Sequence, residues 1–412
     1  MRILLMYRLM NGLEPVLQSK TWSPSGIPTA ARLIEALDNS DHDVDLVLYP
    51  SELGSMPKRV GNKTHQYNVE GLNTTITIVD YGMLNHLPRR LAQNLTSFYL
   101  AWWSLKYARL RKPDIYYTDR GNVIAASLIT RMTNIRTVLR VFGVPSALWQ
   151  VLNNNYHPLL IAMRWAFRAR FDAVIGTRDG SNIKAFLDRA LSDEVPRHIR
   201  INGHIPVPKL SQSGQTEEPS SQIVKIVYLG RLDQGKGVKT VIEAVLDLSR
   251  TLRKKCSLTI IGSGPMEAQL HKYVEEEKGT NQVTFLGRIE NKKVPAELVH
   301  HDIYISLNES GQISNANIEA ASSGLAMIFA DTVSGDDVDA CEVFDDKTVI
   351  RIGRKNLKST LNNVLAELIN NPEKIERLKK ASLAAAARLP QWDERILWEI
   401  DLLEQMSFDK QE

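Results

Sequence analysis

Residues 224–237 read V-K-I-V-Y-L-G-R-L-D-Q-G-K-G. The stretch begins with alternating apolar residues as far as Tyr228, a pattern typical of a β-strand. It ends in a glycine-rich turn that contains Arg231 and Lys236, and apolar residues at helical spacing follow. Free backbone N–H groups, two cations and a helix N-terminus suit a polyanion such as a diphosphate. From the spacing alone, an ordinary strand–turn–helix with solvated charges explains the stretch equally well.

The composition is that of a folded protein with two large domains. The 412 residues exceed one typical domain, and 43% of them are hydrophobic and 24% charged. A net charge of +4 does not favour nucleic acid as a partner. Cys256 and Cys341 lie far apart, which excludes a disulfide framework and suits a reducing compartment. The apolar run at 3–7 is too short for a signal peptide, and no run reaches the ~18 residues that span a bilayer.

Short β runs alternate with helical patterns through both halves, which is typical of parallel sheets in an α/β protein. Residues 211–221 contain no large apolar side chain and are predicted to form a linker. We therefore expect an N-terminal domain over 1–210, a C-terminal domain over 222–388 and a final helix over 389–412. The expected strands are 3–7, 45–49, 75–79, 114–118, 137–141, 172–176 and 198–202, then 223–228, 257–261, 283–286, 303–307 and 327–330.

Glycine-bearing turns follow four successive strands of the second half, at 230–237, 262–265, 287–289 and 308–314. Ligands of open α/β sheets bind at the carboxyl ends of strands, where glycine allows close backbone approach. Ser314 is predicted to cap the helix after the last turn, and Gly324 to end it. Glu319, little more than one turn into this helix, could bind a ribose, although a charge stabilised by the helix dipole is the simpler interpretation.

These turns resemble those of the family 4 glycosyltransferases, which are retaining enzymes of the GT-B fold. The similarity covers most of 223–332 in the family's order and spacing. It implies two Rossmann-like parallel-sheet domains that face a cleft, with the nucleotide sugar in the second domain and the acceptor in the first. It also implies that the C-terminal helix packs back on the first domain. The matching segments are 230–232, 236–237, 243–244, 260–265, 283–287 and 318–324, with looser matches at Gly26, 171–176 and 201–204.

The resemblance implies a role for each matching residue. Arg231 and Lys236 would hold the diphosphate and stabilise its negative charge as the glycosidic bond breaks. Glu319 would bind the ribose. The other implied contacts are Gly230 in the diphosphate turn, Gly287, Arg288 and Ile289 at the base, Gln312, Ile313 and Ser314 at the sugar or diphosphate, and Gly26 in the first domain.

One departure concerns the family's Glu-x7-Glu motif. Its first Glu should stand at 311, which is Gly311, whereas Glu309 lies ten residues before Glu319. A two-residue insertion at 311–312 would keep the Glu309 carboxylate as a sugar contact. The alternative is that Gln312 or Asn315 takes its place.

A second departure lies in the first domain, where residues 116–122 lack the histidine that many members carry. Either Asp119 or Arg120 replaces it, or the acceptor is handled differently. The simpler interpretation of Asp119 and Arg120 is a surface ion pair that contributes little.

We expect no metal and no cofactor besides the nucleotide-sugar substrate. Two Asp-x-Asp sequences, at 43–45 and 337–339, resemble the cation site of another glycosyltransferase fold, but neither follows a phosphate turn. Arg231 and Lys236 would supply the positive charge instead. The isolated histidines lack the spacing of metal ligands.

Segments 98–112 and 163–170 combine aromatic and basic residues. Helices of this kind can lie on anionic membrane surfaces. Core-facing aromatics with solvated basic faces are the simpler interpretation. Peripheral membrane contact through the N-terminal domain is therefore a hypothesis that the sequence leaves open.

The sequence thus predicts a retaining, hexosyl-type glycosyltransferase of the cytoplasm or the inner face of the membrane. Its substrates would be a nucleotide-diphosphate sugar and a glycan or lipid-linked acceptor, in polysaccharide or glycoconjugate synthesis. The rival interpretations are a non-catalytic glycosyltransferase-like subunit, which the displaced Glu309 leaves open, and another GT-B sugar-nucleotide enzyme such as an epimerase.

Overall fold

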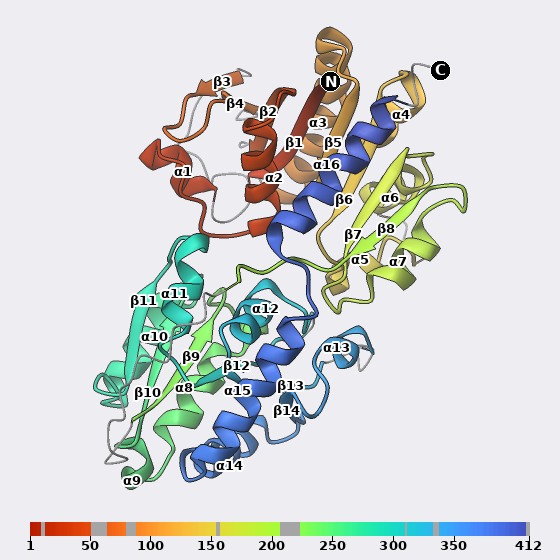
Figure 1. Cartoon of the computed structure of the whole chain (residues 1–412). Coiled ribbons are helices and arrows are strands. Elements are labelled where there is room, and N and C mark those ends of the chain that lie inside the picture. The colour runs from red at the N-terminus through yellow and green to blue at the C-terminus, as the bar shows by residue number, and fades with distance from the viewer. Residues whose placement is uncertain are drawn as a thin grey trace. The chain divides into compact units, whose positions relative to one another are not determined.

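The computed structural model of the chain divides into two compact units (Figure 1). It describes residues 1–9, 13–50, 64–79, 88–153, 157–206, 223–309, 311–332 and 338–408. Unit 1 comprises Met1–Arg178, Asn182–Arg200 and the chain from Asp393 onward; unit 2 comprises Asp179–Ser181 and Ile201–Trp392. The predicted linker at 211–221 and Asp337 of the second Asp-x-Asp sequence lie outside the described residues.

Unit 1 is built on an eight-stranded sheet in the order β3-β4-β2-β1-β5-β6-β7-β8. Its neighbouring strands are parallel, except that β3 is antiparallel to β4. Its elements are β1 (Arg2–Leu9), α1 (Glu14–Ser19), α2 (Pro28–Asp38), β2 (Asp43–Pro50), β3 (Thr64–Tyr67), β4 (Ile76–Val79), α3 (Arg89–Arg111), β5 (Ile115–Asp119), η2 (Arg120–Asn122), α4 (Val123–Met132), β6 (Arg136–Val141), α5 (Ser146–Trp149), α6 (Pro158–Phe167), β7 (Ala173–Thr177), α7 (Ile183–Ala190), β8 (Arg197–Arg200) and, from the C-terminal part of the chain, α16 (Trp392–Phe408).

Unit 2 is built on a six-stranded parallel sheet in the order β11-β10-β9-β12-β13-β14. Its elements are β9 (Val224–Leu229), η3 (Gln234–Lys236), α8 (Val238–Leu246), α9 (Arg250–Arg253), β10 (Cys256–Ile261), α10 (Glu267–Glu276), β11 (Val283–Gly287), η4 (Asn291–Lys293), α11 (Val294–Leu298), β12 (Ile303–Ser306), α12 (Asn315–Ser322), β13 (Ala326–Ala330), α13 (Val338–Val343), β14 (Val349–Ile352), α14 (Leu357–Ile369) and α15 (Pro372–Ala386).

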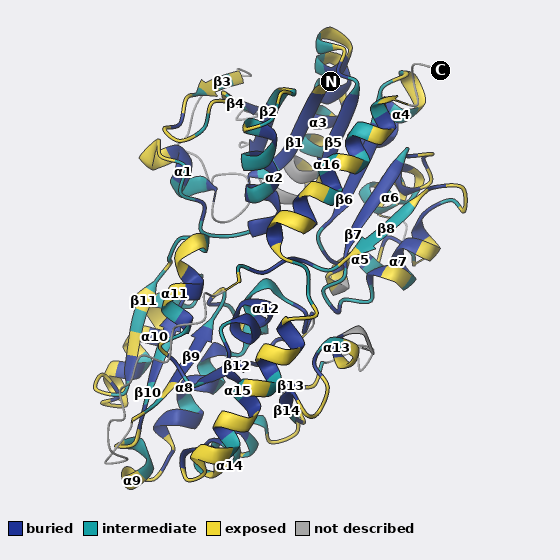
Figure 2. Ribbon diagram, viewed as in Figure 1, coloured by how far each residue is buried: buried dark blue, intermediate teal, exposed yellow. Residues whose placement is uncertain are grey.

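The two parallel α/β sheets confirm the predicted architecture, and each expected strand agrees with the structure to within two residues at either end. The central strands are apolar because helices cover both of their faces, and Figure 2 shows them in dark blue as buried. The sequence interpretation missed β3, a polar edge strand with alternating exposure, and β14, an edge strand interrupted by Arg351. It also missed α4, which is apolar on nearly all sides and so lacks an amphipathic pattern.

The two faces of the unit 1 sheet carry different helices. Adjacent side chains of β5 point to opposite faces because side chains alternate along a strand. The Tyr116 hydroxyl accepts a hydrogen bond from Asn122 (2.7 Å), in the core that α3, α4 and α6 cover. The Tyr117 hydroxyl donates to Glu399 of α16, the helix that crosses the sheet in Figure 1. The predicted packing of a C-terminal helix on the first domain is thereby confirmed.

A buried ionic cluster fixes α16 to unit 1. The Glu399 carboxylate lies 2.7 Å from Arg395 of the same helix and 3.7 Å from Arg140 of β6. Arg140 also donates to the Ile175 carbonyl (3.0 Å), and its guanidinium lies 4.8 Å from the centre of the Phe142 ring. Burial raises the pKa of a carboxyl group, but the two guanidinium groups and the Tyr117 hydroxyl outweigh it and lower the pKa of Glu399.

Candidate functional site

The site expected from the sequence lies at the point where the strand order of unit 2 reverses. The chain builds β9, β10 and β11 in one direction and then returns to the other side of β9 to build β12, β13 and β14. In open parallel sheets, ligands bind beside the carboxyl ends of the strands at such a switch point. The turns that follow β9 and β12 are therefore the first places to examine.

Backbone hydrogen bonds join the turns after β9, β10 and β11. The Gly230 N–H donates to the Ile261 carbonyl (3.0 Å), and the Leu232 N–H donates to the Ser263 carbonyl (3.0 Å). The Gly262 N–H donates in turn to the carbonyl of Gly287 (2.7 Å). The glycine-bearing turns predicted at separate strand ends thus form one connected edge of the sheet.

Two positions in these turns require glycine. Gly262 has a φ of +132°, and a Cβ atom there would lie 1.9 Å from the carbonyl oxygen of Gly230. Gly237 has a φ of +68° immediately before α8, and its Cβ would lie 2.7 Å from the Cβ of Leu307. Any side chain would therefore push the turns after β9, β10 and β12 apart.

Arg231 and Lys236 lie in the same turn at the carboxyl end of β9. The Arg231 side chain is half exposed, with its Nε 3.2 Å from an Asp233 carboxylate oxygen. Lys236 is the last residue of η3 and is partly buried. Burial lowers the pKa of Lys236, while Asp233 and Asp179 act in the opposite direction. A diphosphate next to this turn would meet two cations whose local counter-charges are Asp233 and Asp179.

The turn after β12 brings Glu309 against the turn after β9. The Glu309 N–H donates to the Gly235 carbonyl (3.1 Å), and the exposed Glu309 carboxylate lies beside Gly235. Gly311, two residues further on, has a φ of +75°. The structure therefore places Glu309 next to Lys236's turn despite its displaced spacing in the sequence.

Gln312 supports this turn from inside. Its side chain is fully buried, and its amide donates to the carbonyls of Asn308 (3.1 Å) and Ala330 (2.8 Å). Asn317 donates to both the carbonyl and the side-chain oxygen of Gln312. The Gln312 side chain is therefore committed to the protein interior, and it is a poor substitute for the missing carboxylate.

The start of α12 is organised as predicted, with one difference. The Ser314 hydroxyl accepts from the Asn317 N–H (3.3 Å), so Ser314 is the N-cap, and Gly324 follows the helix with a φ of +73°. The Ile313 N–H donates to the carbonyl of Asp179 (3.0 Å). The Ile313 amide is therefore not available for the sugar or diphosphate contact that the resemblance implied.

Glu319 lies in the second turn of α12 and is 7% exposed. Its backbone carbonyl accepts hydrogen bonds from Ser322 and Ser323 at the end of the helix. Burial raises the pKa of the Tyr304 phenol, and the nearby Glu319 carboxylate raises it further. Asn315, the other alternative for the missing carboxylate, accepts a hydrogen bond from Asn202 (2.6 Å).

The predicted base-binding residues lie at the far side of the switch point, after β11. Gly287 has a φ of +66°, and open space surrounds the position of a Cβ. The Arg288 guanidinium donates to the Ser263 hydroxyl through two nitrogens (2.8 and 3.0 Å), which connects this turn to the one after β10. Ile289 packs against the core of unit 2.

Arg354 is a site residue that the sequence interpretation missed. It follows β14 and donates to the carbonyls of Leu307 (3.3 Å) and Asn308, so it holds the turn that carries Glu309. Burial lowers the pKa of Arg354, and the nearby carboxylates of Glu309 and Asp331 oppose this shift. A sequence signal existed, because Gly-Arg stands at the carboxyl ends of β9, β11 and β14 alike, at 230–231, 287–288 and 353–354.

Asp119 occupies the corresponding switch point of unit 1, between β1 and β5. It is only 2% exposed and accepts hydrogen bonds from the Tyr49 hydroxyl (2.8 Å) and the Gly121 N–H (3.1 Å). Burial raises the pKa of Asp119, although Arg8 lowers it. The interpretation as a surface ion pair is therefore wrong for Asp119. Gly26 lies two residues before α2 in this unit.

Comparisons with known proteins agree with this architecture. Residues 212–384 match the family model of glycosyl transferases group 1. An uncharacterized glycosyltransferase of Methanocaldococcus jannaschii is 27% identical over 133 residues, which are 32% of this chain and 34% of that relative. The chain thus matches about a third of the relative's length.

Solved structures extend the likeness to nearly the whole chain. Sucrose-phosphate synthase from Thermosynechococcus elongatus has a TM-score of 0.68 at 15% identity, with 98% of each chain covered. The HepE protein of Anabaena, solved in complex with UDP, has a TM-score of 0.64 at 13% identity, with 98% of this chain and all of that chain covered. At these identities the likeness is one of fold, and it confirms the predicted GT-B architecture.

Proposed function

Because residues 212–384 match the family model of glycosyl transferases group 1, we propose that the protein transfers a hexose from a nucleotide-diphosphate sugar. The acceptor in this proposal is a glycan or a lipid-linked saccharide, and the configuration at the transferred carbon is retained. The observation that carries the proposal is the pair Arg231 and Lys236 at the switch point of unit 2.

The two cations give the proposed site its catalytic role. Charge builds up on the leaving diphosphate as the glycosidic bond breaks, and preorganised cations stabilise that charge. Arg231 would contact the diphosphate through its planar guanidinium, and Lys236 as a point charge. Glu309, beside the same turn, would accept hydrogen bonds from the sugar.

The rest of the donor would extend along the carboxyl edge of the sheet. In this proposal the Glu319 carboxylate binds the ribose, and the backbone around Gly287 and Ile289 meets the base. Gly230 and the start of α12 at Ser314 lie against the phosphates. The Arg288 guanidinium, held by Ser263, borders the base.

In the proposed retaining transfer, the leaving group itself takes part in the chemistry. The acceptor oxygen forms a bond to the anomeric carbon on the face from which the diphosphate departs. The acceptor proton passes to the departing diphosphate oxygen, so no separate protein base or metal ion is required in the proposal. Arg231 and Lys236 would keep that diphosphate in place during the exchange.

Unit 1 would supply the acceptor site, with Gly26 and Asp119 at the carboxyl edge of its sheet. HepE's complex with UDP favours a uridine nucleotide as the first donor to test. Polysaccharide or glycoconjugate synthesis at the cytoplasmic face of a membrane would supply acceptors of this class. Among the described residues, no helix is both long enough and apolar enough to cross a membrane.

The first experiment is a thermal-shift screen against UDP, GDP, ADP and their sugars. A ligand at ~100 times its Kd stabilises the folded state by about 2.7 kcal/mol. At roughly 2–4 °C per kcal/mol, the matching nucleotide should raise Tm by about 5–10 °C. A protein whose Tm responds to none of these ligands would contradict a nucleotide-sugar site.

The second experiment measures nucleotide release from the donor, with water as the acceptor. Replacing Arg231 and Lys236 together by alanine should reduce release at least about 10³-fold, since one such donor contributes ~10²–10³. Lys254→Ala/Lys255→Ala is the matched control, because both lysines are exposed just before the amino end of β10. Nucleotide binding without any turnover in the wild type would favour the non-catalytic subunit, and interconversion of the sugar would favour an epimerase.

A further inference from the structure

Unit 1 carries an exposed apolar and basic surface on the helices that cover the face of its sheet opposite α16. We call it the helical face, and it combines residues from α3, α4 and α6. Its exposed apolar members are Leu91, Leu95, Phe98 and Trp102 of α3, Met132 of α4, and Ile161 and Trp165 of α6.

The α3 part of the helical face is a continuous stripe. Leu91, Leu95, Phe98 and Trp102 follow one another at intervals of three or four residues, so they share one side of the helix. Phe98 is 46% and Trp102 57% exposed, while the opposite side of α3 is buried through Leu100 and Ala101. The sequence interpretation in which these aromatics all face the core is therefore wrong for Phe98 and Trp102.

Contacts between helices join the stripe to α4 and α6. Arg109 of α3 donates to the Met132 carbonyl at the end of α4 (3.5 Å). The Arg131 guanidinium of α4 lies 3.9 Å from the centre of the Trp165 ring on α6 and donates to the Trp165 carbonyl (3.3 Å). Trp165 is 47% exposed and Met132 52%. The three helices thus present one surface.

The charge of this region is of one sign. No Asp or Glu occurs in residues 81–113 or 120–171, which include all of α3, α4 and α6. Exposed Lys106 and Arg109 continue the α3 stripe, and Lys106 lies 5.4 Å from the centre of the Trp102 ring. Neither has a carboxylate partner among the residues that the structure describes. The helical face therefore carries uncompensated positive charge beside its apolar side chains.

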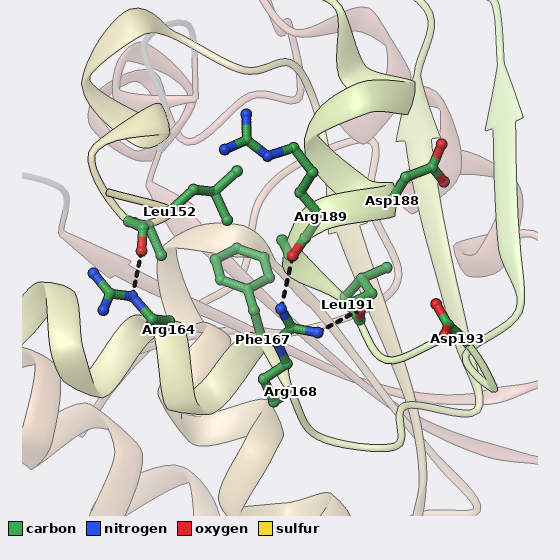
Figure 3. Close-up of a pocket in the computed structure, with 10 residues that line it drawn as sticks. Leu152, Arg164, Phe167, Arg168, Asp188, Arg189, Leu191 and Asp193 are labelled. Carbon is green, nitrogen blue, oxygen red and sulfur yellow. Dashed lines mark hydrogen bonds between the residues drawn. The ribbon is translucent and has the colours of Figure 1, made fainter. Parts of the chain in front are cut away.

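A cavity of about 430 Å³ at the end of α6 extends the basic character (Figure 3). Arg164 and Arg168 line it and donate to backbone carbonyls, Arg164 to Val151 (2.8 Å) and Arg168 to Leu191 (3.1 Å). The two carboxylates of the lining, Asp188 and Asp193, pair with Arg197 instead. Within the described part of the chain, Arg164 and Arg168 thus have no acidic partner, and each donates to two backbone carbonyls.

We propose that the helical face docks on the surface of an anionic phospholipid membrane. The exposed aromatic and aliphatic side chains would enter the headgroup boundary, and Lys106, Arg109 and Arg168 would meet lipid phosphates. The direction of α3 supports this occupant. Since α3 follows β4 and precedes β5, its Leu91 end lies at the carboxyl edge of the sheet, where a lipid-linked acceptor would be bound.

Vesicle flotation tests the docking without nucleotide sugar or turnover, so its outcome is independent of the proposed reaction. The wild type should float with vesicles of phosphatidylcholine and phosphatidylglycerol but not with phosphatidylcholine alone. Binding should weaken between about 0.1 M and 1 M salt, as the Debye length falls from ~10 to ~3 Å. Lys106→Glu/Arg109→Glu should weaken it at least about 25-fold, at roughly five-fold per basic residue removed.

Phe98→Ser/Trp102→Ser should abolish flotation without a loss of Tm, since both side chains are exposed. Lys254→Glu/Lys255→Glu on unit 2 changes the net charge equally and should float like the wild type. The proposal is overturned if the wild type does not float with the anionic vesicles. It is also overturned if the unit 2 variant loses vesicle binding as fully as the α3 variants. The proposal is likewise overturned if the wild type is a dimer that does not bind vesicles and Phe98→Ser/Trp102→Ser converts it to a monomer. The helical face would then join two copies of this chain.

Discussion

Replacing Glu399 by glutamine should destabilise unit 1 severely, although the side chain keeps its size. The substitution removes the negative charge that Arg140 and Arg395 share in the interior, where all three side chains are almost or fully inaccessible to water. No other carboxylate among the described residues pairs with either arginine. Two buried guanidinium groups would then remain uncompensated, while the glutamine oxygen could still accept from Tyr117.

The expected magnitude follows from this geometry. Removing one partner of a buried ion pair costs about 3–5 kcal/mol, and here one deletion leaves two cations unpaired, which favours the upper part of that range. For a unit of this size, roughly 2–4 °C per kcal/mol converts the loss into a Tm decrease of about 6–20 °C. Such a change is a large fraction of the ~5–15 kcal/mol that stabilises a typical domain.

The pH dependence gives a second readout. Because the pKa of Glu399 is lowered in the folded state, its contribution is complete above the unfolded value of about 4.3 and is lost as the pH falls through the folded value. The difference in Tm between wild type and Glu399→Gln should therefore be constant near neutral pH. It should shrink below about pH 4.

Differential scanning calorimetry would measure the transition of each unit. Glu404→Gln is the matched control, since it removes one charge from the same helix, where the half-exposed Glu404 lies 3.0 Å from His42. That pair should contribute at most about 1 kcal/mol. If Glu399→Gln unfolds within a degree of Glu404→Gln, the buried cluster does not stabilise the docking of α16 and the reasoning is refuted.

Three further predictions concern unit 2. Gly262→Ala should lower Tm by several degrees and weaken nucleotide binding, because its Cβ would meet the Gly230 carbonyl at 1.9 Å; an unchanged Tm would show that the turns separate freely. The pKa of Lys236 is below the usual ~10.4, so donor affinity measured by calorimetry should decline as the pH rises through that pKa. Lys236→Arg should keep its donor affinity to higher pH. If the affinity of the wild type and that of Lys236→Arg decline in parallel, Lys236 is excluded as the titrating group. Glu309→Gln should reduce kcat/KM at least about ten-fold and leave the affinity for free nucleotide unchanged. Glu319→Gln, by contrast, should weaken the affinity for free nucleotide. Full activity of Glu309→Gln would exclude Glu309 as a sugar contact.

The sequence predicted the sheets of both units because buried parallel strands are apolar throughout and glycine-bearing turns mark their ends. Two edge strands, β3 and β14, escaped prediction because they carry polar residues, such as Arg351 in β14. With β14 unrecognised, Gly353 and Arg354 had no strand to follow. Arg354 therefore could not be linked to the turn of Glu309, which only the tertiary structure shows.

The Ser314 cap was predictable from residue type and spacing, whereas the roles of Arg231 and Lys236 in the candidate site stay predictions. The candidate site was not predictable where a side chain turns inward. Gln312 has the residue type of a ligand contact, but its amide supports two backbone carbonyls. Residue type alone cannot distinguish a glutamine that contacts a ligand from one that supports the backbone, because either role satisfies the same side-chain donors and acceptors.

The path of the chain has a consequence for the order of folding during synthesis. Apart from Asp179–Ser181, unit 2 is one stretch from Ile201 to Trp392, whereas unit 1 requires α16, which the ribosome makes after every other described element. Until α16 emerges, Arg140 lacks its carboxylate and the face of β5 that carries Tyr117 stays uncovered. The N-terminal unit, first to be synthesised, is therefore the last to be completed, and nascent chains need protection of that face throughout the synthesis of unit 2.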